Sequence, residues 1–357
     1  MRYKKIVIKI GTSVITDENG YLDLPRIKNI VEQIAQIRKE GVDVIVVLSG
    51  AVTAGKTLFQ EAKPVTSPKE KQLYASVGQI SLMNYFSKQF FDKKITIGQI
   101  LATKEDFRDR KHYLNMRSCF EALLGKEVIP VVNENDAISF HGATFTDNDE
   151  LAGLIASMLN CDALIVLTDV DGVCDKHPKH KDAKCLTKVD PKETNVFDFI
   201  TSEKSSCGTG GMFSKCKIAT RLSAIGIGTH IVNGTKENII SSVMEGKLVG
   251  TEFVAQKNIS SMKRWLANSQ GHEVGSVFIN EGAKEKLLTN GSVSLLPVGI
   301  ISVEGEFEKG DIIAIKTEYN QVLGRGVAQY NSSKAGALMG KKGEKPLVRC
   351  DYLFIIE

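Results

Sequence analysis

The chain has 357 residues, of which 42% are hydrophobic and 25% are charged, and its formal net charge is +4. This composition excludes a disordered chain and suffices for one large core plus a smaller domain, while the small net charge does not by itself imply a nucleic-acid partner. No apolar run is long enough to cross a membrane, MRYKK leads directly into a strand pattern without a signal peptide, and the seven cysteines contain no CxxC pair. We therefore expect a cytoplasmic protein without a membrane partner and without a disulfide framework.

The N-terminal half alternates strand and helix patterns. Residues 4–10 form a β-branched strand pattern, residues 24–40 an amphipathic helix pattern that stops at Gly41, and residues 42–48 a second buried strand pattern. The alternation continues with a helix over 69–88 that contains small residues, a strand over 95–101, a helix over 113–125, and strands ending at Val132 and Leu167. Consecutive strand–helix–strand units are right-handed, so we predict an α/β domain with a mostly parallel sheet.

The segment from Gly50 to Thr57 matches the P-loop pattern GxxxxGK[ST] directly after an apolar strand. In a P-loop, Lys56 would reach the terminal phosphates of a nucleotide and Thr57 would ligate magnesium. The alternative is a small-residue turn followed by a helix that carries Lys56 on its solvated side. The local sequence leaves both interpretations open.

The segment 131–153, VVNENDAISFHGATFTDNDELAG, concentrates carboxamides and carboxylates at the end of an apolar run. The preceding EVIPVV is typical of a buried parallel strand, and parallel sheets bind ligands at their carboxyl edge. Asp147, Asn148 and Asp149 come directly before a helical pattern, so we predict that they cap a helix N-terminus. A cap explains only one such residue, and the cluster therefore indicates a functional site.

Two later segments also carry candidate binding residues. The glycine-rich CGTGGMFSK places Lys215 on a helix next to glycine amides, an arrangement that can clamp a phosphate. The segment CDKHPKHKDAKC contains Cys174, His177, His180 and Cys185, but their spacing does not give the two ligand pairs separated by a loop that are typical of zinc sites, and the nearby lysines repel a cation. We favour a solvated excursion there, although the sequence does not decide whether these four residues bind a metal.

The pattern changes towards the C-terminus. Residues 228–233 and 250–254 are typical of the last strands of the first domain, and residues after 275 are typical of short strands and turns. We therefore expect a catalytic domain over 1–255, a linker over 256–274 and a small mainly-β module over 275–357. This module contains ten basic and ten acidic residues, so its formal charge is zero.

The order of several motifs resembles the glutamate 5-kinase family, in its bacterial form with a C-terminal PUA domain. These motifs are KIGTSVIT, LSGAVTAG, KQLYASVGQ, PVVNENDAI, DNDELAG, LTDVDGV, GTGGMFSK, RW, INEGA and SLLPVGI. The resemblance implies the amino acid kinase fold, a three-layer αβα sandwich with a mostly parallel sheet and no Walker P-loop, followed by a mainly-β PUA-like domain. It also implies ATP- and Mg²⁺-dependent phosphorylation of the γ-carboxylate of L-glutamate to γ-glutamyl phosphate, the first step of proline biosynthesis.

The resemblance assigns three sets of site residues in this sequence. The residues implied in catalysis are Lys9, Lys215 and Asp149, the aspartate orienting the two lysines. The residues implied in glutamate binding are Ser49, Gly50, Ala51, Asn133, Asp136, Asp147 and Asn148. The residues implied in ATP binding are Lys9, Gly11, Thr168, Asp169, Thr209, Gly210, Gly211, Met212, Phe213, Ser214 and Lys215, and none is implied as a metal ligand.

These assignments agree with the chemistry, because an anionic nucleophile that attacks an anionic phosphate needs cations. The γ-carboxylate is already ionised near neutral pH and needs no general base. The resemblance further implies a homo-oligomer (dimer or tetramer), feedback inhibition by proline and a transient contact with glutamyl phosphate reductase. Contacts to the nucleotide base and the strength of proline inhibition stay open, since the segments around 177–185, 202–207 and 53–67 depart from the family pattern.

Two alternatives stay open at this stage. The first is another amino acid kinase, of the acetylglutamate kinase or aspartokinase type. The second is an RNA-binding role through the PUA-like module, against which its zero net charge argues.

Overall fold

The computed structural model describes residues 1–60, 65, 67–108, 110–138, 145, 147–175, 183–199, 211–256, 260–267, 269, 273–289 and 293–356. Contacts within the chain divide it into two compact units, Met1–Asn258 and Ile259–Glu357. Each unit has its own cluster of buried hydrophobic side chains. Helix α10 (Ser261–Ala267) lies in the segment expected as a linker and belongs to the second unit. The boundaries at 255 and 275 stay predictions.

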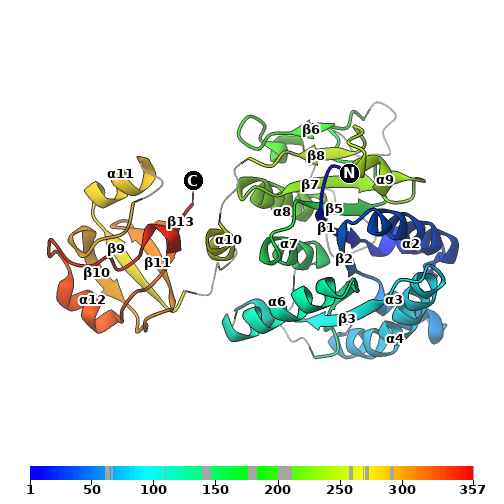
Figure 1. The fold of residues 1–357 in the computed structure, drawn as a ribbon, viewed down its shortest axis with the longest axis horizontal. Helices are drawn as coiled ribbons and strands as arrows, with labels where there is room; N and C mark the ends of the chain where they lie inside the picture. The colour runs from blue at the N-terminus through cyan, green and yellow to red at the C-terminus, as the bar shows by residue number, and fades with distance from the viewer. Residues whose placement is uncertain are drawn as a thin grey trace. The chain divides into compact units, whose positions relative to one another are not determined.

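The first unit contains an eight-stranded sheet in the order β3-β4-β2-β1-β5-β7-β8-β6 (Figure 1). Its strands are β1 (Lys5–Ile10), β2 (Asp43–Leu48), β3 (Ile97–Ala102), β4 (Ile129–Glu134), β5 (Ala163–Thr168), β6 (Lys188–Val189), β7 (Gly228–Asn233) and β8 (Thr251–Phe253). Neighbouring strands are parallel except for β7 and β8. Strands β2, β4 and β3 all lie on one side of β1, and β5 is the first strand on its other side. The strand order therefore reverses between β1 and β5, and parallel sheets bind ligands at the carboxyl ends of the strands at such a point.

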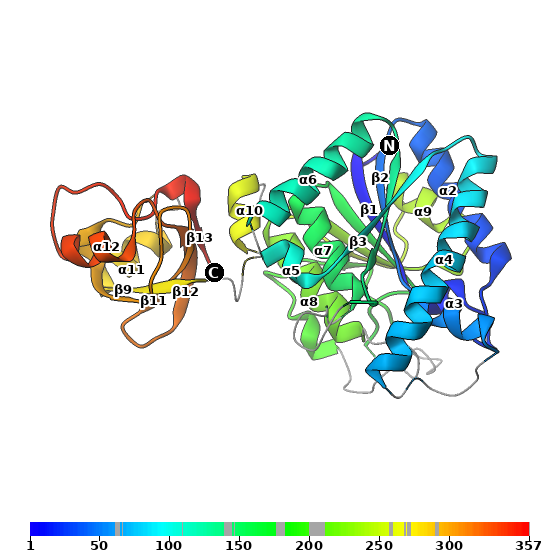
Figure 2. The same cartoon turned by 90° about the horizontal axis from the view of Figure 1, so that it is seen from below.

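Helices cover both faces of this sheet, as Figure 2 shows: α2, α3, α4 and α9 lie on one side and α6, α7 and α8 on the other. The elements outside the sheet are α1 (Thr12–Ile15), α2 (Leu24–Lys39), α3 (Ala51–Leu58), α4 (Pro68–Asp92), α5 (Lys104–Arg108), α6 (Arg110–Gly125), α7 (Asn148–Met158), the 3₁₀ turn η1 (Val196–Phe199), α8 (Met212–Ala224) and α9 (Ile239–Met244). With helices on both faces, β1, β2, β4 and β5 are buried almost throughout, as continuous apolar runs require. The predicted three-layer α/β fold is confirmed.

Helices α3 and α4 approach each other closely because two glycines face each other across their contact. A Cβ on Gly78 would lie 1.9 Å from the carbonyl oxygen of Ala51, and a Cβ on Gly55 would lie 2.0 Å from that of Tyr74. No side chain fits at either position, which confirms that the small residues of the 69–88 segment allow close packing. A capping box between Ser67 and Glu70 fixes the start of α4. This contact sets the position of α4 beside the carboxyl edge of the sheet.

The second unit is built around a five-stranded sheet in the order β10-β9-β11-β12-β13. Its elements are α10, β9 (Gly275–Ile279), α11 (Glu281–Thr289), η2 (Pro297–Gly299), β10 (Ile300–Glu304), β11 (Ile312–Thr317), β12 (Val322–Val327), α12 (Ser332–Leu338), η3 (Cys350–Tyr352) and β13 (Leu353–Ile355). Its strands pair antiparallel except for β9 and β11. The expected mainly-β module is therefore confirmed.

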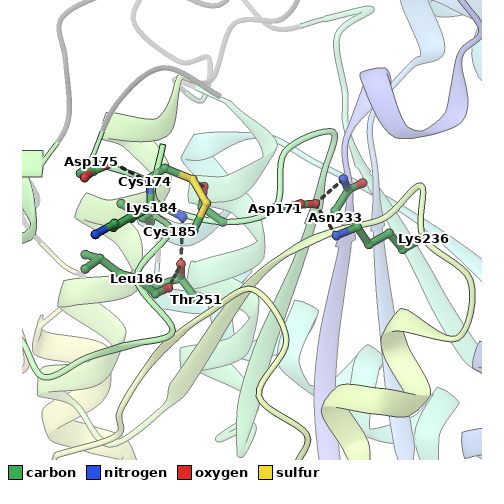
Figure 3. The surroundings of a disulfide bond; sticks show 11 residues. Asp171, Cys174, Asp175, Lys184, Cys185, Leu186, Asn233, Lys236 and Thr251 are labelled. Atoms are coloured by element: carbon green, nitrogen blue, oxygen red, sulfur yellow. Dashed lines mark hydrogen bonds and ion pairs between the residues drawn. A yellow bond between two sulfur atoms is a disulfide. The ribbon is translucent and has the colours of Figure 1, made fainter. Parts of the chain in front are cut away.

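Cys174 and Cys185 form a disulfide bond, a single pair that the expectation of no disulfide framework did not foresee (Figure 3). The two residues meet because the chain doubles back, so that their backbones form an isolated antiparallel bridge. In this pairing the two sulfurs are bonded to each other and are not thiolate ligands. His177 and His180 lie outside the described residues.

Within the described part of the chain, no helix is long and apolar enough to cross a membrane.

Candidate active site

One buried carboxylate bridges two buried lysines at the carboxyl edge of the sheet. The Nζ of Lys9 lies 2.9 Å from Oδ1 of Asp149, and the Nζ of Lys215 lies 3.0 Å from Oδ2 of the same carboxylate. Lys9 is 5% exposed, Lys215 is 8% exposed and Asp149 is fully buried. The three residues predicted as catalytic, which are far apart in the sequence, therefore form one cluster.

The charges of this cluster determine the protonation of its carboxylate. Burial by itself raises the pKa of Asp149, but the ammonium groups of Lys9 and Lys215 outweigh it and hold this pKa below its ordinary value. Burial raises the pKa of the neighbouring Asp147, and the charge of Asp149 raises it further. Asp149 is therefore ionised at neutral pH, and the cluster carries one net positive charge when both lysines are protonated.

Three secondary-structure elements position the cluster. Lys9 is the penultimate residue of β1, and Asp149 lies in the first turn of α7. Asp147 is the N-cap of α7, and its Oδ1 accepts hydrogen bonds from the backbone N–H groups of residues 149 and 150, as the sequence predicts. Lys215 lies in the first turn of α8, which packs closely on α7 because a Cβ on Gly153 would lie 2.8 Å from Ile218. Two positive helix N-termini thus flank the cluster, which favours a bound anion.

A chain of carboxamides lies beside the cluster. The Nδ2 of Asn148 lies 2.6 Å from the carbonyl oxygen of Leu48, 3.1 Å from Oγ of Ser49 and 2.8 Å from Oδ1 of Asn133. The Nδ2 of Asn133 donates in turn to Oε1 of Gln79 at 2.7 Å. The structure therefore brings together Ser49, Asn133 and Asn148, three of the residues predicted to bind substrate.

The turn after β2 requires a residue without a side chain at position 50. Gly50 has φ +104°, a conformation that favours glycine, and a Cβ there would lie 2.8 Å from Ile15. Ala51 follows as the first residue of α3 and is buried. After β1, the backbone of Gly11 lies close to the end of β5. Its N–H donates to the carbonyl oxygen of Leu167, and a Cβ on Gly11 would lie 3.2 Å from that oxygen.

A pocket of about 280 Å³ opens between α4 and the ends of β3 and β4. It is lined by Ala51, Ala75, Ser76, Gln79, Ile80, Gln99, Leu101, Glu134, Asn135, Asp136 and Ala137. Asp136 forms an ion pair of 2.8 Å with Lys71 of α4, whose side chain is 43% exposed. The pocket therefore combines a carboxylate, a nearby cation and carboxamides, which suit a small zwitterion.

The residues predicted to bind nucleotide lie at the end of β5 and the start of α8. Thr168 ends β5, and its hydroxyl donates to Oδ1 of Asp169 at 3.2 Å. Gly211 is the N-cap of α8, and the first three helical residues are Met212, Phe213 and Ser214. The exposed ring of Phe213 lies 5.1 Å from that of Phe197. Thr209 and Gly210 lie outside the described residues.

A second cluster lies on the same edge of the sheet. Asp171 accepts from Nδ2 of Asn233 at 2.8 Å and pairs with Lys236 at 2.7 Å (Figure 3). In the described part of the chain, no group of three or more His, Cys, Asp or Glu side chains could hold a metal ion.

The GxxxxGKT segment does not form a P-loop. Residues Ala51–Leu58 are helical throughout, and Gly55 contacts the backbone of α4 where a P-loop would wrap around a phosphate. Lys56 lies in the last turn of α3, and the hydroxyl of Thr57 donates to the carbonyl oxygen of Thr53 at 3.0 Å. The helical alternative given by the sequence is therefore the correct one.

Lys56→Ala is expected to leave kcat and the KM for ATP within a few-fold of the parent protein, because the lysine lies at the C-terminal end of a helix. Steady-state kinetics at varied ATP concentration test this expectation. A loss of ATP binding would contradict it and restore the P-loop interpretation.

Sequence reasoning missed two residues of this site, Lys71 and Gln79. Both lie on α4, where Lys71, Ala75 and Gln79 follow one another at intervals of four residues and therefore share one helix face. This spacing is visible in KQLYASVGQ, but a helix pattern does not say which strand ends it will face.

The comparisons with known proteins agree with this architecture. A model of the amino acid kinase family matches residues 4–233, and a model of the PUA domain matches residues 275–347. A glutamate 5-kinase of Chlorobaculum tepidum is 47% identical over 356 residues, which are 99% of this chain and 98% of that protein. A glutamate 5-kinase of Bacteroides thetaiotaomicron is 40% identical over 356 residues, which are 99% of each.

Two solved structures share the fold of the first unit. The UMP kinase from Bacillus anthracis aligns with a TM-score of 0.51 at 18% identity and covers 72% of this chain and 98% of its own. An isopentenyl phosphate kinase aligns with a TM-score of 0.50 at 18% identity and covers 70% of this chain and 100% of its own. At such low identity the likeness shows the fold alone.

Proposed function

The chain belongs to the amino acid kinase family and, within it, to the glutamate 5-kinases that carry a PUA domain, and from this membership we propose that it phosphorylates the γ-carboxylate of L-glutamate with ATP. The single observation that carries the proposal is the cluster of Lys9, Asp149 and Lys215 beside a pocket suited to an amino acid. The product is γ-glutamyl phosphate, and the reaction is the first step of proline biosynthesis.

The transfer needs charge stabilisation and no proton movement. A γ-carboxylate oxygen forms a bond with the γ-phosphorus of ATP, while the bond from this phosphorus to the β,γ-bridging oxygen breaks and ADP leaves with the electron pair. Lys9 and Lys215 neutralise the oxygens that approach each other in this step. Asp149 is unsuited as a general base, because both of its oxygens contact ammonium groups and its pKa is lowered. Its role is to position the two lysines.

The remaining assignments follow from where the residues lie. Asp136 would hold the ammonium group of glutamate, while Ser49, Gly50, Ala51, Asn133, Asp147 and Asn148 would shape the rest of its site. Thr168 and Asp169 at the end of β5, together with Gly11 and the start of α8, would hold ATP. Mg²⁺ in kinases is usually held by one or two carboxylates and the substrate phosphates. When bound with ATP it would neutralise phosphate charge.

An ATP-dependent hydroxamate assay with glutamate, aspartate and acetylglutamate in parallel tests the proposal. Hydroxylamine traps acyl phosphates, so we expect hydroxamate with glutamate in clear preference to the other two. Preferred turnover of aspartate or acetylglutamate would show that the chain is a different amino acid kinase.

The PUA-like module is expected to be dispensable for phosphoryl transfer, because every residue assigned to the site lies between Lys9 and Lys215. A chain truncated after Gln256 should retain kcat within a few-fold, since the first unit has its own core. Circular dichroism and the hydroxamate assay measure folding and activity of the truncated chain. A folded but inactive truncated chain would show that the module completes the site.

A homo-oligomer, feedback inhibition by proline and transfer of the product to a reductase stay predictions from the family resemblance, and a cytoplasmic location stays a prediction from the sequence pattern. The labile acyl phosphate makes the last of these chemically reasonable, because rapid consumption protects it from hydrolysis.

A further inference from the structure

We propose that Gln79 binds the α-carboxylate of the amino-acid substrate and thereby contributes to its selection. The inference rests on the proposed function and adds a residue on α4 to the substrate site. It follows from the polarity of the carboxamide chain that joins Gln79 to Asn148.

Backbone groups at both ends fix the orientation of each amide in this chain. The backbone N–H of Glu134 donates to Oδ1 of Asn133 at 2.9 Å, so Nδ2 of Asn133 is the donor towards Gln79. At the other end, the carbonyl oxygen of Leu48 can only accept, so Nδ2 of Asn148 faces it. The hydrogen bond from Asn133 therefore occupies Oε1 of Gln79, and Nε2 of Gln79 is left as the donor end of the chain.

This donor is buried and has no hydrogen-bond partner among the residues that the structure describes. A buried donor without a partner costs roughly 1–3 kcal/mol, so a ligand that accepts its hydrogen bond recovers that free energy. Gln79 lines the 280 Å³ pocket and its side chain is only partly buried, so a ligand in this pocket contacts the residue that carries the unpartnered donor.

The pocket indicates which acceptor Gln79 meets. Asp136 lines the same pocket and suits an ammonium group, so a donor nearby suits the carboxylate on the same carbon. The reacting γ-carboxylate must lie at Lys9 and Lys215. Asn148 directly precedes Asp149 in α7, and Gln79 is connected to Asn148 only through the side chain of Asn133. Gln79 therefore lies farther from the lysines, towards the end of the substrate that carries the α-carboxylate.

Two inhibitors that each lack one group of glutamate test this assignment. Glutarate keeps both carboxylates and lacks the ammonium group, whereas 4-aminobutanoate keeps the ammonium group and lacks the α-carboxylate. Gln79→Glu keeps the oxygen that accepts from Asn133 and replaces the donor by a second oxygen, and Gln79→Met removes both polar atoms. The measurements are the KM for glutamate and the inhibition constants of both compounds against glutamate.

Both variants are expected to raise the KM for glutamate and the inhibition constant of glutarate by roughly 10- to 100-fold, with a much smaller change in kcat. The inhibition constant of 4-aminobutanoate should change by no more than a few-fold. Gln72→Glu, on the same helix two turns earlier and outside the pocket lining, is the matched control and should leave all three constants unchanged.

An equal rise in the inhibition constants of glutarate and 4-aminobutanoate would show that Gln79 has only a structural role. An unchanged KM for glutamate and unchanged inhibition constants would show that Gln79 binds a water molecule at most. Either result overturns the inference while parent activity on glutamate preserves the proposed function. A parent protein that does not phosphorylate glutamate overturns both.

Discussion

Replacing either Lys9 or Lys215 by alanine lowers kcat by roughly 10² to 10³, the effect of removing one group that stabilises charge in a transition state. Both ammonium groups lie within 3.0 Å of the same carboxylate, and all three side chains are buried. The two variants should be similar in magnitude because the lysines share one counter-ion. The measurement is kcat at saturating ATP and glutamate, with each variant first shown to be folded.

Lys93→Ala is the matched control, because Lys93 forms a 2.8 Å ion pair with Glu32 at the protein surface, away from the sheet edge. It should leave kcat unchanged, since exposed ion pairs contribute little. A Lys9→Ala variant with the kcat of the parent protein would mean that this lysine does not meet the transferred phosphoryl group.

Asp149→Asn removes the carboxylate charge that lies between the two buried lysines. Breaking a buried ion pair by removing one partner costs on the order of 3–5 kcal/mol of folding free energy, because an uncompensated charge stays buried. The lysines also lose their fixed positions, so we expect kcat to fall by roughly 10² to 10³ as well. Urea unfolding at neutral pH and steady-state kinetics measure the two effects.

The stability effect of Asp149→Asn should also depend on pH. The folded-state pKa of Asp149 is lowered, so its ionised form contributes stability above the unfolded value of about 3.9 and loses this contribution as the pH falls below it. The difference in stability between the parent and the variant should therefore narrow in acid. A variant that matches the parent in both stability and kcat at neutral pH would contradict the bridging role of this carboxylate.

Much of the fold is predictable from the sequence because its elements are locally specified. Continuous apolar runs such as that over 42–48 are typical of buried parallel strands, and the capping residue Asp147 is recognisable by its position before a helical pattern. The Lys9, Asp149 and Lys215 cluster depends on three segments meeting in space. Their meeting follows from the family resemblance together with the rule that ligands bind at the carboxyl edge of parallel strands.

Other features depend on tertiary contacts that no local pattern reveals. The GKT segment satisfies a P-loop pattern, yet its second glycine is required by the close approach of α3 and α4 at Tyr74. The Cys174–Cys185 disulfide requires the chain to double back, which cysteine spacing alone does not indicate. The unpartnered donor of Gln79 becomes visible only when the hydrogen bonds of Asn133 are known.

The most direct test of the account is to follow the carboxylate oxygen during the reaction. Glutamate labelled with oxygen-18 in its γ-carboxylate is incubated with ATP, and hydroxylamine then cleaves the acyl phosphate at its carbonyl carbon. If the γ-carboxylate attacks phosphorus as proposed, the phosphate released carries one labelled oxygen, which phosphorus NMR detects as an isotope shift. Phosphate without the label would mean that water attacks ATP and that the cluster of Lys9, Asp149 and Lys215 does not catalyse transfer to glutamate.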